Sequence, residues 1–261
     1  SFVPVFWMAT EDHDFQEIST LNIFNRNLSV VKEDGMGVGK LNPEIFTPIL
    51  ESLKDLFKND FRFKNLESIF SASLNQQNWA NATRYWISKV FEKENLIVID
   101  ADDVKLKKLF LPVFKNELEK QFIYNSVENT NNKLRSLGYE PKINPRVLNL
   151  FFLEDKKRHR IIFENNVFKI GDSNLKLEEI LSLLNSSPEK FSPNVLMRPI
   201  YQELLLPNLV YVGGPSELVY WSQLKKSFDQ VDINFPILIL RDHFNWMSEK
   251  IYNQWKKLGF T

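Results

Sequence analysis

Residues 3–14 read Val3-Pro4-Val5-Phe6-Trp7-Met8-Ala9-Thr10-Glu11-Asp12-His13-Asp14. The first seven residues form a short apolar run, whereas the next five are polar. A continuous apolar run of this length is typical of a parallel strand that is covered on both faces. Three further runs of this kind precede polar residues, at 96–99, 209–212 and 236–240. The pattern therefore predicts an α/β fold with a mostly parallel sheet and flanking helices.

Helical periodicity lies between and after these runs. Apolar residues recur every three to four positions in four segments, which begin at Phe46, Trp79, Leu218 and Met247. We expect these helix faces to pack on the core.

Two stretches depart from the alternation of strands and helices. Residues 102–137 are predicted to be helical and to run over the surface as an insertion. Residues 147–171 contain short alternating runs separated by polar turns, which indicates a small antiparallel β insertion with two hairpins. Residues 1–261 as a whole are predicted to form one α/β core with these two additions.

Composition excludes several classes of protein. Lys+Arg and Asp+Glu are both 33, so no net charge favours a nucleic acid or an anionic membrane surface as a partner. Because there is neither a long apolar run nor a signal-peptide pattern, we expect a cytoplasmic protein with small-molecule partners. With no cysteine and three scattered histidines, no metal site is predicted. An apolar strand that starts almost at Ser1 indicates a fragment of a longer protein.

The polar residues after the first strand are the first candidate site. Asp12, His13 and Asp14 are predicted to be catalytic, and Glu11 to bind substrate. Neighbouring acids raise one another's pKa and hold an imidazole in one tautomer, as general acid–base catalysis requires. Ligands of open parallel sheets bind at such strand ends. The alternative is that Asp or Thr10 merely caps the following turn.

A second candidate site begins where the strand at 209–212 ends. Gly213, Gly214, Ser216 and Glu217 are predicted to bind substrate, since glycines let the backbone approach a ligand and a helix start favours a carboxylate or phosphate. The alternative is a plain strand-to-helix turn capped by Ser216.

Arg198 stands before a proline in a largely apolar stretch. Its guanidinium is a candidate for binding a carboxylate bidentately, and the alternative is a structural ion pair. Asn81 and Arg84 are candidates for the same pocket. A bound cation and a helix cap are the two interpretations of Asp100, Asp102 and Asp103.

The segment Gly35-Met36-Gly37-Val38-Gly39-Lys40 is rich in glycine but does not follow a strand. It therefore lacks the strand–loop–helix context of a nucleotide-binding loop. We predict a mobile loop and leave open that it closes over the site.

Three long segments occur in a fixed order: residues 3–15, with the pattern VPVFW-x-A-x-EDHDF; residues 194–207, which begin Asn194-Val195-Leu196-Met197-Arg198-Pro199; and residues 211–221, which begin Tyr211-Val212-Gly213-Gly214-Pro215-Ser216-Glu217. Together they resemble the BshC family, the cysteine-adding enzymes of bacillithiol synthesis. The second segment adds Tyr201 and Gln202 to the substrate-binding candidates.

The resemblance implies a Rossmann-like core and a ligase that joins cysteine to glucosaminyl malate in the last step of bacillithiol synthesis. The family's upstream glycine motif and its coiled coil have no counterpart here, so we expect both chain ends to be missing and a homodimer to form through the missing coiled coil. The cofactor is unknown, and ATP stays open.

The resemblance also gives the candidate residues roles. The acids at 11–14 are expected to hold the ammonium group of cysteine, and Arg198 and the helix start at 215–217 the carboxylates of malate. Two alternatives remain: a nucleotide-dependent transferase that acts on a sugar, and a binding module without catalytic activity.

Overall fold

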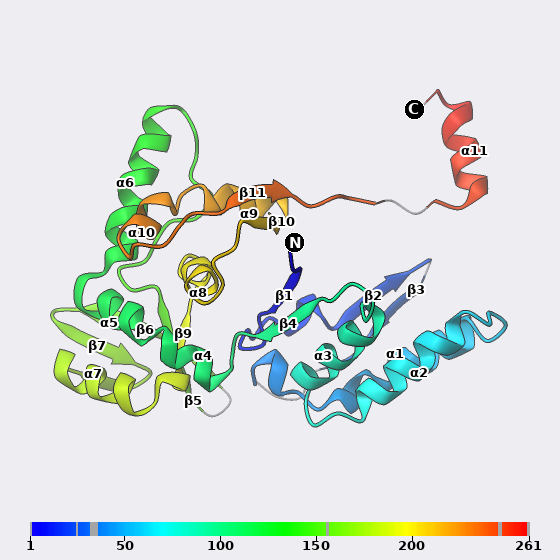
Figure 1. Ribbon diagram of the computed structural model, residues 1–261, viewed down its shortest axis with the longest axis horizontal. Helices are drawn as coiled ribbons and strands as arrows, with labels where there is room; N and C mark the ends of the chain where they lie inside the picture. Colours follow the sequence, from blue (N-terminus) through cyan, green and yellow to red (C-terminus); the bar gives the residue numbers. More distant parts are fainter. Residues whose placement is uncertain (1, 25, 32–35, 155–156, 245–246, 260–261) are drawn as a thin grey trace.

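A computed structural model describes residues 2–24, 26–31, 36–154, 157–244 and 247–259 of the chain (Figure 1). Strands and helices alternate through much of it, joined by short 3-10 turns at Phe15–Glu17, Val38–Lys40, Pro43–Phe46 and Pro188–Lys190. The α/β fold class predicted from the sequence is confirmed.

All four predicted parallel strands are present. β1 (Val5–Met8) pairs in parallel with β4 (Ile97–Asp100), and β10 (Val210–Gly213) pairs in parallel with β11 (Ile237–Leu240). They form two separate pairs in the described residues rather than one continuous sheet. The expectation that they are covered on both faces is wrong for β10 and β11, because Val212 and Ile237 are 59% and 65% exposed.

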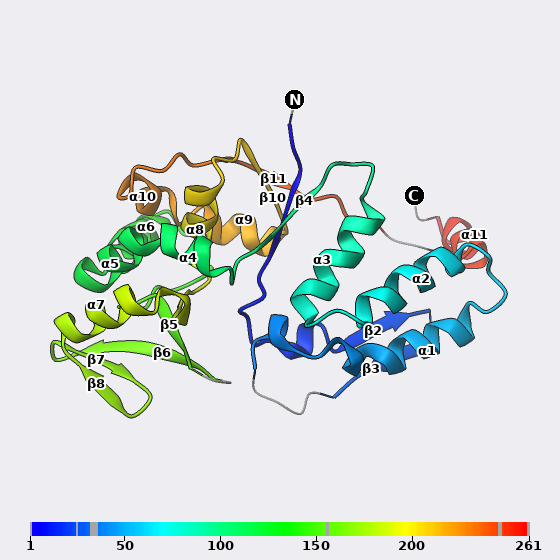
Figure 2. The ribbon, with the colours of Figure 1, turned by 60° about the horizontal axis from the view of Figure 1, so that its bottom comes forward.

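Residues 15–91 form a lobe with its own small core. A hairpin of β2 (Thr20–Ile23) and β3 (Arg26–Ser29) lies beside α1 (Thr47–Leu56), α2 (Phe63–Leu74) and α3 (Trp79–Val90), as Figure 2 shows. Phe46 stacks on Trp79 with ring centroids 3.9 Å apart, and Leu50 is buried. The core-facing stripe predicted from Phe46 is confirmed at Leu50, and the stripe predicted from Trp79 is confirmed at Ala82 but not at Val90, which is 41% exposed.

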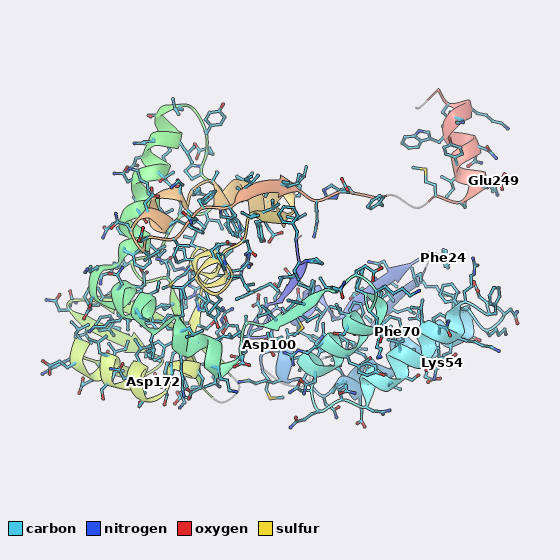
Figure 3. All side chains as sticks on the ribbon, viewed as in Figure 1. Phe24, Lys54, Phe70, Asp100, Asp172 and Glu249 are labelled. Atoms are coloured by element: carbon cyan, nitrogen blue, oxygen red, sulfur yellow. The ribbon has the colours of Figure 1, made fainter. Side chains whose placement is uncertain are left out.

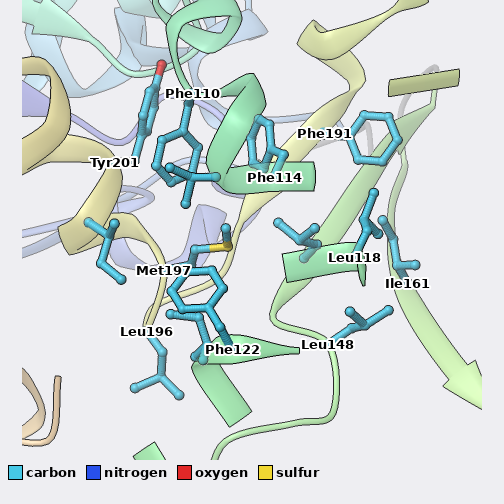
Figure 4. Close-up of a cluster of buried hydrophobic side chains, with 14 of the residues drawn as sticks. Phe110, Phe114, Leu118, Phe122, Leu148, Ile161, Phe191, Leu196, Met197 and Tyr201 are labelled. Carbon is cyan, nitrogen blue, oxygen red and sulfur yellow. The ribbon is translucent and has the colours of Figure 1, made fainter. Parts of the chain in front are cut away.

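The helical stretch predicted for 102–137 consists of α4 (Val104–Leu109), α5 (Leu111–Lys120) and α6 (Phe122–Ser136). It does not run over the surface as predicted. Its apolar residues supply the centre of the main core, where Phe110, Phe114 and Ile123 have no exposed surface (Figure 4). The prediction was wrong because polar residues alternate with the buried apolar ones in these helices, so the apolar stripe is not evident from the sequence.

An antiparallel sheet occupies the predicted β insertion and extends past it. Its strand order is β8-β7-β6-β5-β9. The strands are β5 (Leu150–Glu154), β6 (Lys157–Glu164), β7 (Val167–Ile170), β8 (Ser173–Leu175) and β9 (Phe191–Pro193), and α7 (Leu177–Ser186) packs against the sheet. The β6–β7 hairpin turns at Asn165 and Asn166, both with positive φ, as tight hairpins favour. The other predicted turn, at 155–156, lies outside the described residues.

The last helices are α8 (Arg198–Leu205), α9 (Pro215–Trp221), α10 (Lys225–Asp229) and α11 (Glu249–Lys257). The single stripe predicted from Leu218 is divided between α9 and α10, although Trp221 and Phe228 are buried as expected. The stripe predicted on α11 is amphipathic but does not pack on the core, since α11 has no buried residue and lies apart from the body (Figure 1).

Candidate functional site

The ends of β1 and β4 meet in a cluster of charged residues. Parallel pairing brings Met8 opposite Asp100, and the Ala101 N–H donates to the Met8 carbonyl oxygen, 3.1 Å away. The Thr10 hydroxyl donates to the Asp100 carboxylate across the two strand ends. Figure 3 shows Asp100 where the lobe of α1–α3 meets the rest of the chain. Residues 10–12 and 100–102 are therefore neighbours, as strand-end residues of a parallel pair should be.

A buried cation joins the acids of these two strand ends. Lys107, on α4, has no exposed surface, and its Nζ lies 2.8 Å from Glu11 Oε2 and 2.6 Å from Asp102 Oδ1. It also donates to the Glu189 carbonyl oxygen at 3.0 Å. Glu11 is itself buried. Glu11, which was predicted from the sequence to bind substrate, thus already has an ionic partner inside the protein.

Burial and pairing act in opposite directions on this ion pair. Burial raises the pKa of the Glu11 carboxyl group, and the neighbouring Lys107 offsets part of that rise. Burial alone would lower the pKa of Lys107, but the carboxylates of Glu11 and Asp102 raise it above the ordinary value. Lys107 therefore stays charged at neutral pH and holds both strand ends together.

The other three residues of the predicted acidic site point to different partners. Asp12 is half exposed and its Oδ1 lies 3.1 Å from Arg158 Nη1. His13 Nδ1 lies 3.1 Å from the Glu11 carbonyl oxygen, and Asp14 is exposed. Glu11 and Asp12 are thus drawn to two different cations, and the four residues do not form one pocket lined by carboxylates.

Lys107 and Arg158 are the residues that the sequence did not single out. Arg158, on β6, also donates to Ser192 Oγ and to the Pro193 carbonyl oxygen, and its guanidinium lies 4.1 Å from the centre of the Phe151 ring. Both cations occur in basic runs that ordinarily lie in solvent, at 105–108 and 157–160. The apolar residues around Lys107 were the only signal that one of these lysines faces inward.

The glycine segment is packed against this cluster. Val38 N–H donates to the Asp12 carbonyl oxygen at 2.7 Å, and Gly39 N–H donates to that of Thr10 at 2.8 Å. A Cβ at Gly39 would lie 2.5 Å from the Thr10 Cβ, so the close approach requires glycine. The described part of the predicted mobile loop is therefore fixed to the strand end, while Gly35 lies outside the described residues.

Asn81 and Arg84 reach the same strand ends from α3. Arg84 Nη2 lies 3.9 Å from Asp100 Oδ2, and Arg84 Nη1 donates to Asn81 Oδ1 at 3.5 Å. These two residues belong with the charged strand-end cluster rather than with Arg198.

A cleft of about 510 Å³ lies between β1 and β10. One wall is formed by residues 3–7 and Ala9, and the other by residues 210–212 and α8. The polar side chains that line it include Arg198, Gln202, Asn208, Tyr211 and Glu217. This cleft gathers several predicted substrate-binding residues from sequence positions far apart.

Arg198 is held at the cleft by hydroxyl and amide groups. Its Nη1 donates to Gln202 Oε1 at 2.9 Å, and its Nη2 donates to the hydroxyls of Tyr211 and Tyr220 at 3.2 and 3.3 Å. Burial alone would lower the pKa of Arg198, but the two tyrosines raise it. The Glu217 carboxylate is 3.9 Å away, so the alternative of a structural ion pair is realised only at long range. A partly buried guanidinium that lines a cleft is suited to bind a carboxylate.

Tyr211 and Glu217 form a second layer around Arg198. The Tyr211 hydroxyl donates to Glu217 Oε1 at 2.6 Å, and burial raises the pKa of Tyr211. Glu217 Oε2 accepts the Gly214 N–H at 2.8 Å, which is one of the free N–H groups at the start of α9. The helix start predicted to bind an anion is thus capped by its own glutamate.

The remaining candidates lie beside the cleft rather than in it. Gly213 is buried, and a Cβ there would lie 2.6 Å from the Tyr211 ring, so glycine allows that ring to fold back. Ser216 is exposed. Tyr201 is buried beneath Trp7 and donates from its hydroxyl to the Ala101 carbonyl oxygen at 3.1 Å. Tyr201 therefore links α8 to the charged strand ends, whereas Arg198 on the same helix faces the cleft.

Neither a cluster of metal ligands nor a membrane-spanning helix occurs in the described residues. No three histidine or acidic side chains in the described ranges converge as metal ligands would. Among the helices described, none has the length and apolar character needed to cross a membrane.

The alternating strands and helices, with a cleft between the parallel strands β1 and β10, define an α/β domain of the Rossmann-like class. A family model described as the N-terminal Rossmann-like domain of bacillithiol biosynthesis BshC matches residues 1–242. The chain therefore belongs to the BshC family, as its three sequence segments indicated.

Full-length relatives support the same assignment. Proteins named "putative cysteine ligase BshC" match from Flavobacterium johnsoniae, with 42% identity over 96% of this chain, and from Flavobacterium psychrophilum, with 40% identity over 100%. A protein of the same name from Staphylococcus saprophyticus is 30% identical over 97% of the chain. The matches cover 47%, 49% and 51% of those proteins, so the chain spans about half the length of the relatives.

Proposed function

We propose that this chain is part of a ligase that adds cysteine to glucosaminyl malate, the last step of bacillithiol biosynthesis. The observation that carries the proposal is the partly buried Arg198, which has 19% of its side chain exposed and lines a cleft in a chain of the BshC family. Malate brings two carboxylates, which a planar guanidinium binds bidentately. The substrates are small molecules, and the proposed protein is cytoplasmic.

Arg198, Gln202 and Glu217 divide the work of binding in this proposal. Arg198 holds a malate carboxylate, and Gln202 fixes the guanidinium through the hydrogen bond at 2.9 Å. Glu217, whose carboxylate lines the same cleft, attracts an ammonium group and balances the charge of Arg198. Two substrates with opposite charges can therefore bind side by side.

His13 is the proposed general base, with Asp12 and Asp14 beside it. In amide formation the attacking amine of the glucosamine unit loses a proton as its nitrogen bonds to the carboxyl carbon of cysteine, and one carboxyl oxygen leaves, either as water or with the group that activates it. The Glu11 carbonyl oxygen favours the tautomer in which Nδ1 carries the proton, which leaves Nε2 as the basic nitrogen. Asp12 adjoins this histidine, since its Oδ1 accepts the His13 backbone N–H at 2.7 Å.

The two glycine-rich segments do not fit a phosphate group. Val38 and Gly39 donate their N–H groups to carbonyl oxygens, and the Gly214 N–H is taken by Glu217. We therefore derive no step from ATP, and the activation of the cysteine carboxyl group is a question for the assay.

The test is product formation by the full-length protein. Glucosaminyl malate and cysteine are incubated with and without ATP, and bacillithiol is measured by mass spectrometry. Asp12→Ala and Arg198→Ala are expected to abolish the product, whereas Arg62→Ala, a control whose side chain is 77% exposed, keeps it. Unchanged turnover in both site variants would refute the assignment.

The assay also separates the two alternatives. A sugar transferase would give a different product from the same mixture. A binding module would bind glucosaminyl malate without forming any product.

A further inference from the structure

A row of three polar side chains, the first two of them fully buried, leads from the core to the first residue of α8. Glu117, on α5, has no exposed surface, and its carboxylate accepts three N–H groups. Oε2 accepts the Ile123 N–H at 3.1 Å, and Oε1 accepts the backbone and side-chain N–H groups of Asn149, both at 3.0 Å. A buried carboxylate with such fixed donors holds those donors firmly in place.

Asn149 connects Glu117 to Asn194 by hydrogen bonds. It is fully buried, and its Nδ2 donates to Glu117 and to the Arg146 carbonyl oxygen. Since Nδ2 is engaged by two acceptors, the amide oxygen must face the other way. There it accepts the Asn194 Nδ2 at 2.9 Å, and the Asn149 backbone oxygen accepts the Asn194 N–H at 2.9 Å.

Asn194 is the last member of the row and touches Arg198 directly through the backbone. Its Oδ1 accepts the N–H groups of Leu196 and Met197 at 3.0 and 3.2 Å, as a helix cap does. Its carbonyl oxygen accepts the Arg198 N–H at 2.9 Å. The start of α8 is therefore fixed to the core by three polar residues in a row.

We propose that Glu117, Asn149 and Asn194 are positioning residues that set the direction of the Arg198 side chain in the cleft. The proposal rests on the proposed function, in which Arg198 binds a malate carboxylate. The row touches no substrate-facing group itself. A shift of α8 by a fraction of a turn moves the guanidinium away from Tyr211 and Tyr220, and a small misplacement of a binding group lowers affinity strongly.

One substitution distinguishes a capping role of Asn194 from its positioning role. Asn194→Asp keeps an oxygen that caps the turn just before α8, since Asp accepts N–H groups as well as Asn does. It removes the Nδ2 donor and places a second acceptor against the Asn149 amide oxygen. A role limited to capping is therefore retained in Asn194→Asp, whereas the positioning role is lost.

The experiment measures binding of glucosaminyl malate to the full-length protein by titration calorimetry. Asn194→Asp is expected to raise the Kd by about tenfold or more. Asn131→Ala is the control, because Asn131 is as buried as Asn149 and is bonded to Gln223 and the Ile143 carbonyl oxygen, away from α8. It should lower the Tm and leave the Kd within about twofold of the wild type. If Asn194→Asp does not fold, Asn149→Ser tests the same row with the same expected Kd.

Arg198→Ala distinguishes the two levels of the proposal. If Arg198→Ala loses binding but Asn194→Asp binds like the wild type, the positioning role is refuted and the role of Arg198 stands. If Arg198→Ala binds like the wild type, the carboxylate role of Arg198 is refuted, and the positioning proposal falls with it.

Discussion

Replacing Lys107 by Met should destabilise the protein strongly, because Lys107 is the cation that the buried Glu11 carboxylate faces. The side chain has no exposed surface and lies within 2.8 Å of Glu11 and 2.6 Å of Asp102. Removing one partner of a buried ion pair costs about 3–5 kcal/mol. Asp102 is 18% exposed and regains some water, so we expect the lower end, about 3 kcal/mol.

The loss should depend on pH in a defined direction. Burial already raises the pKa of Glu11 in the folded state, and without Lys107 only the weaker attraction of Arg158 opposes that effect. A carboxyl group with a raised folded-state pKa binds a proton more tightly in the folded than in the unfolded protein, so stability falls as the pH rises through the folded pKa. The gap between Lys107→Met and the wild type should therefore be larger at pH 8 than at pH 5.

Thermal unfolding at the two pH values measures this effect. A loss of about 3 kcal/mol corresponds to a Tm lowered by roughly 6–12 °C in a chain of this size. Lys107→Met combined with Glu11→Gln should regain much of the loss at pH 8, because no orphaned carboxylate remains at position 11. Lys169→Met, which removes an exposed lysine paired with Glu164, is the control and should keep the wild-type Tm. A wild-type Tm for Lys107→Met at pH 8 would refute the reasoning.

Three further predictions concern other parts of the chain. Burial raises the pKa of Glu117 from 4.5 to about 7. The contribution of Glu117 to the free energy of unfolding should therefore fall by about 3 kcal/mol between pH 4 and pH 8. Urea unfolding of the wild type and of Glu117→Gln measures this difference, and an equal pH dependence in both would contradict it. Gly39→Ala places a Cβ 2.5 Å from that of Thr10 and should destabilise the fold by about 1–3 kcal/mol, whereas Gly37→Ala, with no atom closer than 3.5 Å, should have little effect. Tyr211→Phe removes the hydroxyl between the guanidinium and the carboxylate of the cleft and should weaken glucosaminyl malate binding severalfold in calorimetry; an unchanged Kd would show that this hydroxyl does not orient the guanidinium.

The sequence was most informative where one element decided its own structure. Apolar runs of four or more residues located all four parallel strands, and the polar residues after them located the strand ends. Two consecutive asparagines at 165–166 located a hairpin, because their left-handed conformation is a local property.

The partners of the candidate site residues depend on contacts between distant parts of the chain, which no local sequence pattern predicts. Glu11 is part of an acidic run of three carboxylates, yet its partner is Lys107, 96 positions further along the chain, in a run of lysines that resembles a solvated helix face. The same holds for Asp12 and Arg158. Arg198 was found from sequence because an arginine in an apolar stretch needs a specific reason to be there, but its tyrosine partners emerged only from the fold.

The central claim is that the Arg198 guanidinium binds a carboxylate of glucosaminyl malate for cysteine addition. The most direct measurement is the steady-state kinetics of Arg198→Lys in the full-length protein. Lysine keeps the charge but cannot pair bidentately with a carboxylate. We predict that kcat/KM for glucosaminyl malate falls by about 100-fold, mainly through a higher KM, while the KM for cysteine changes little. A wild-type KM for glucosaminyl malate in Arg198→Lys would contradict the account.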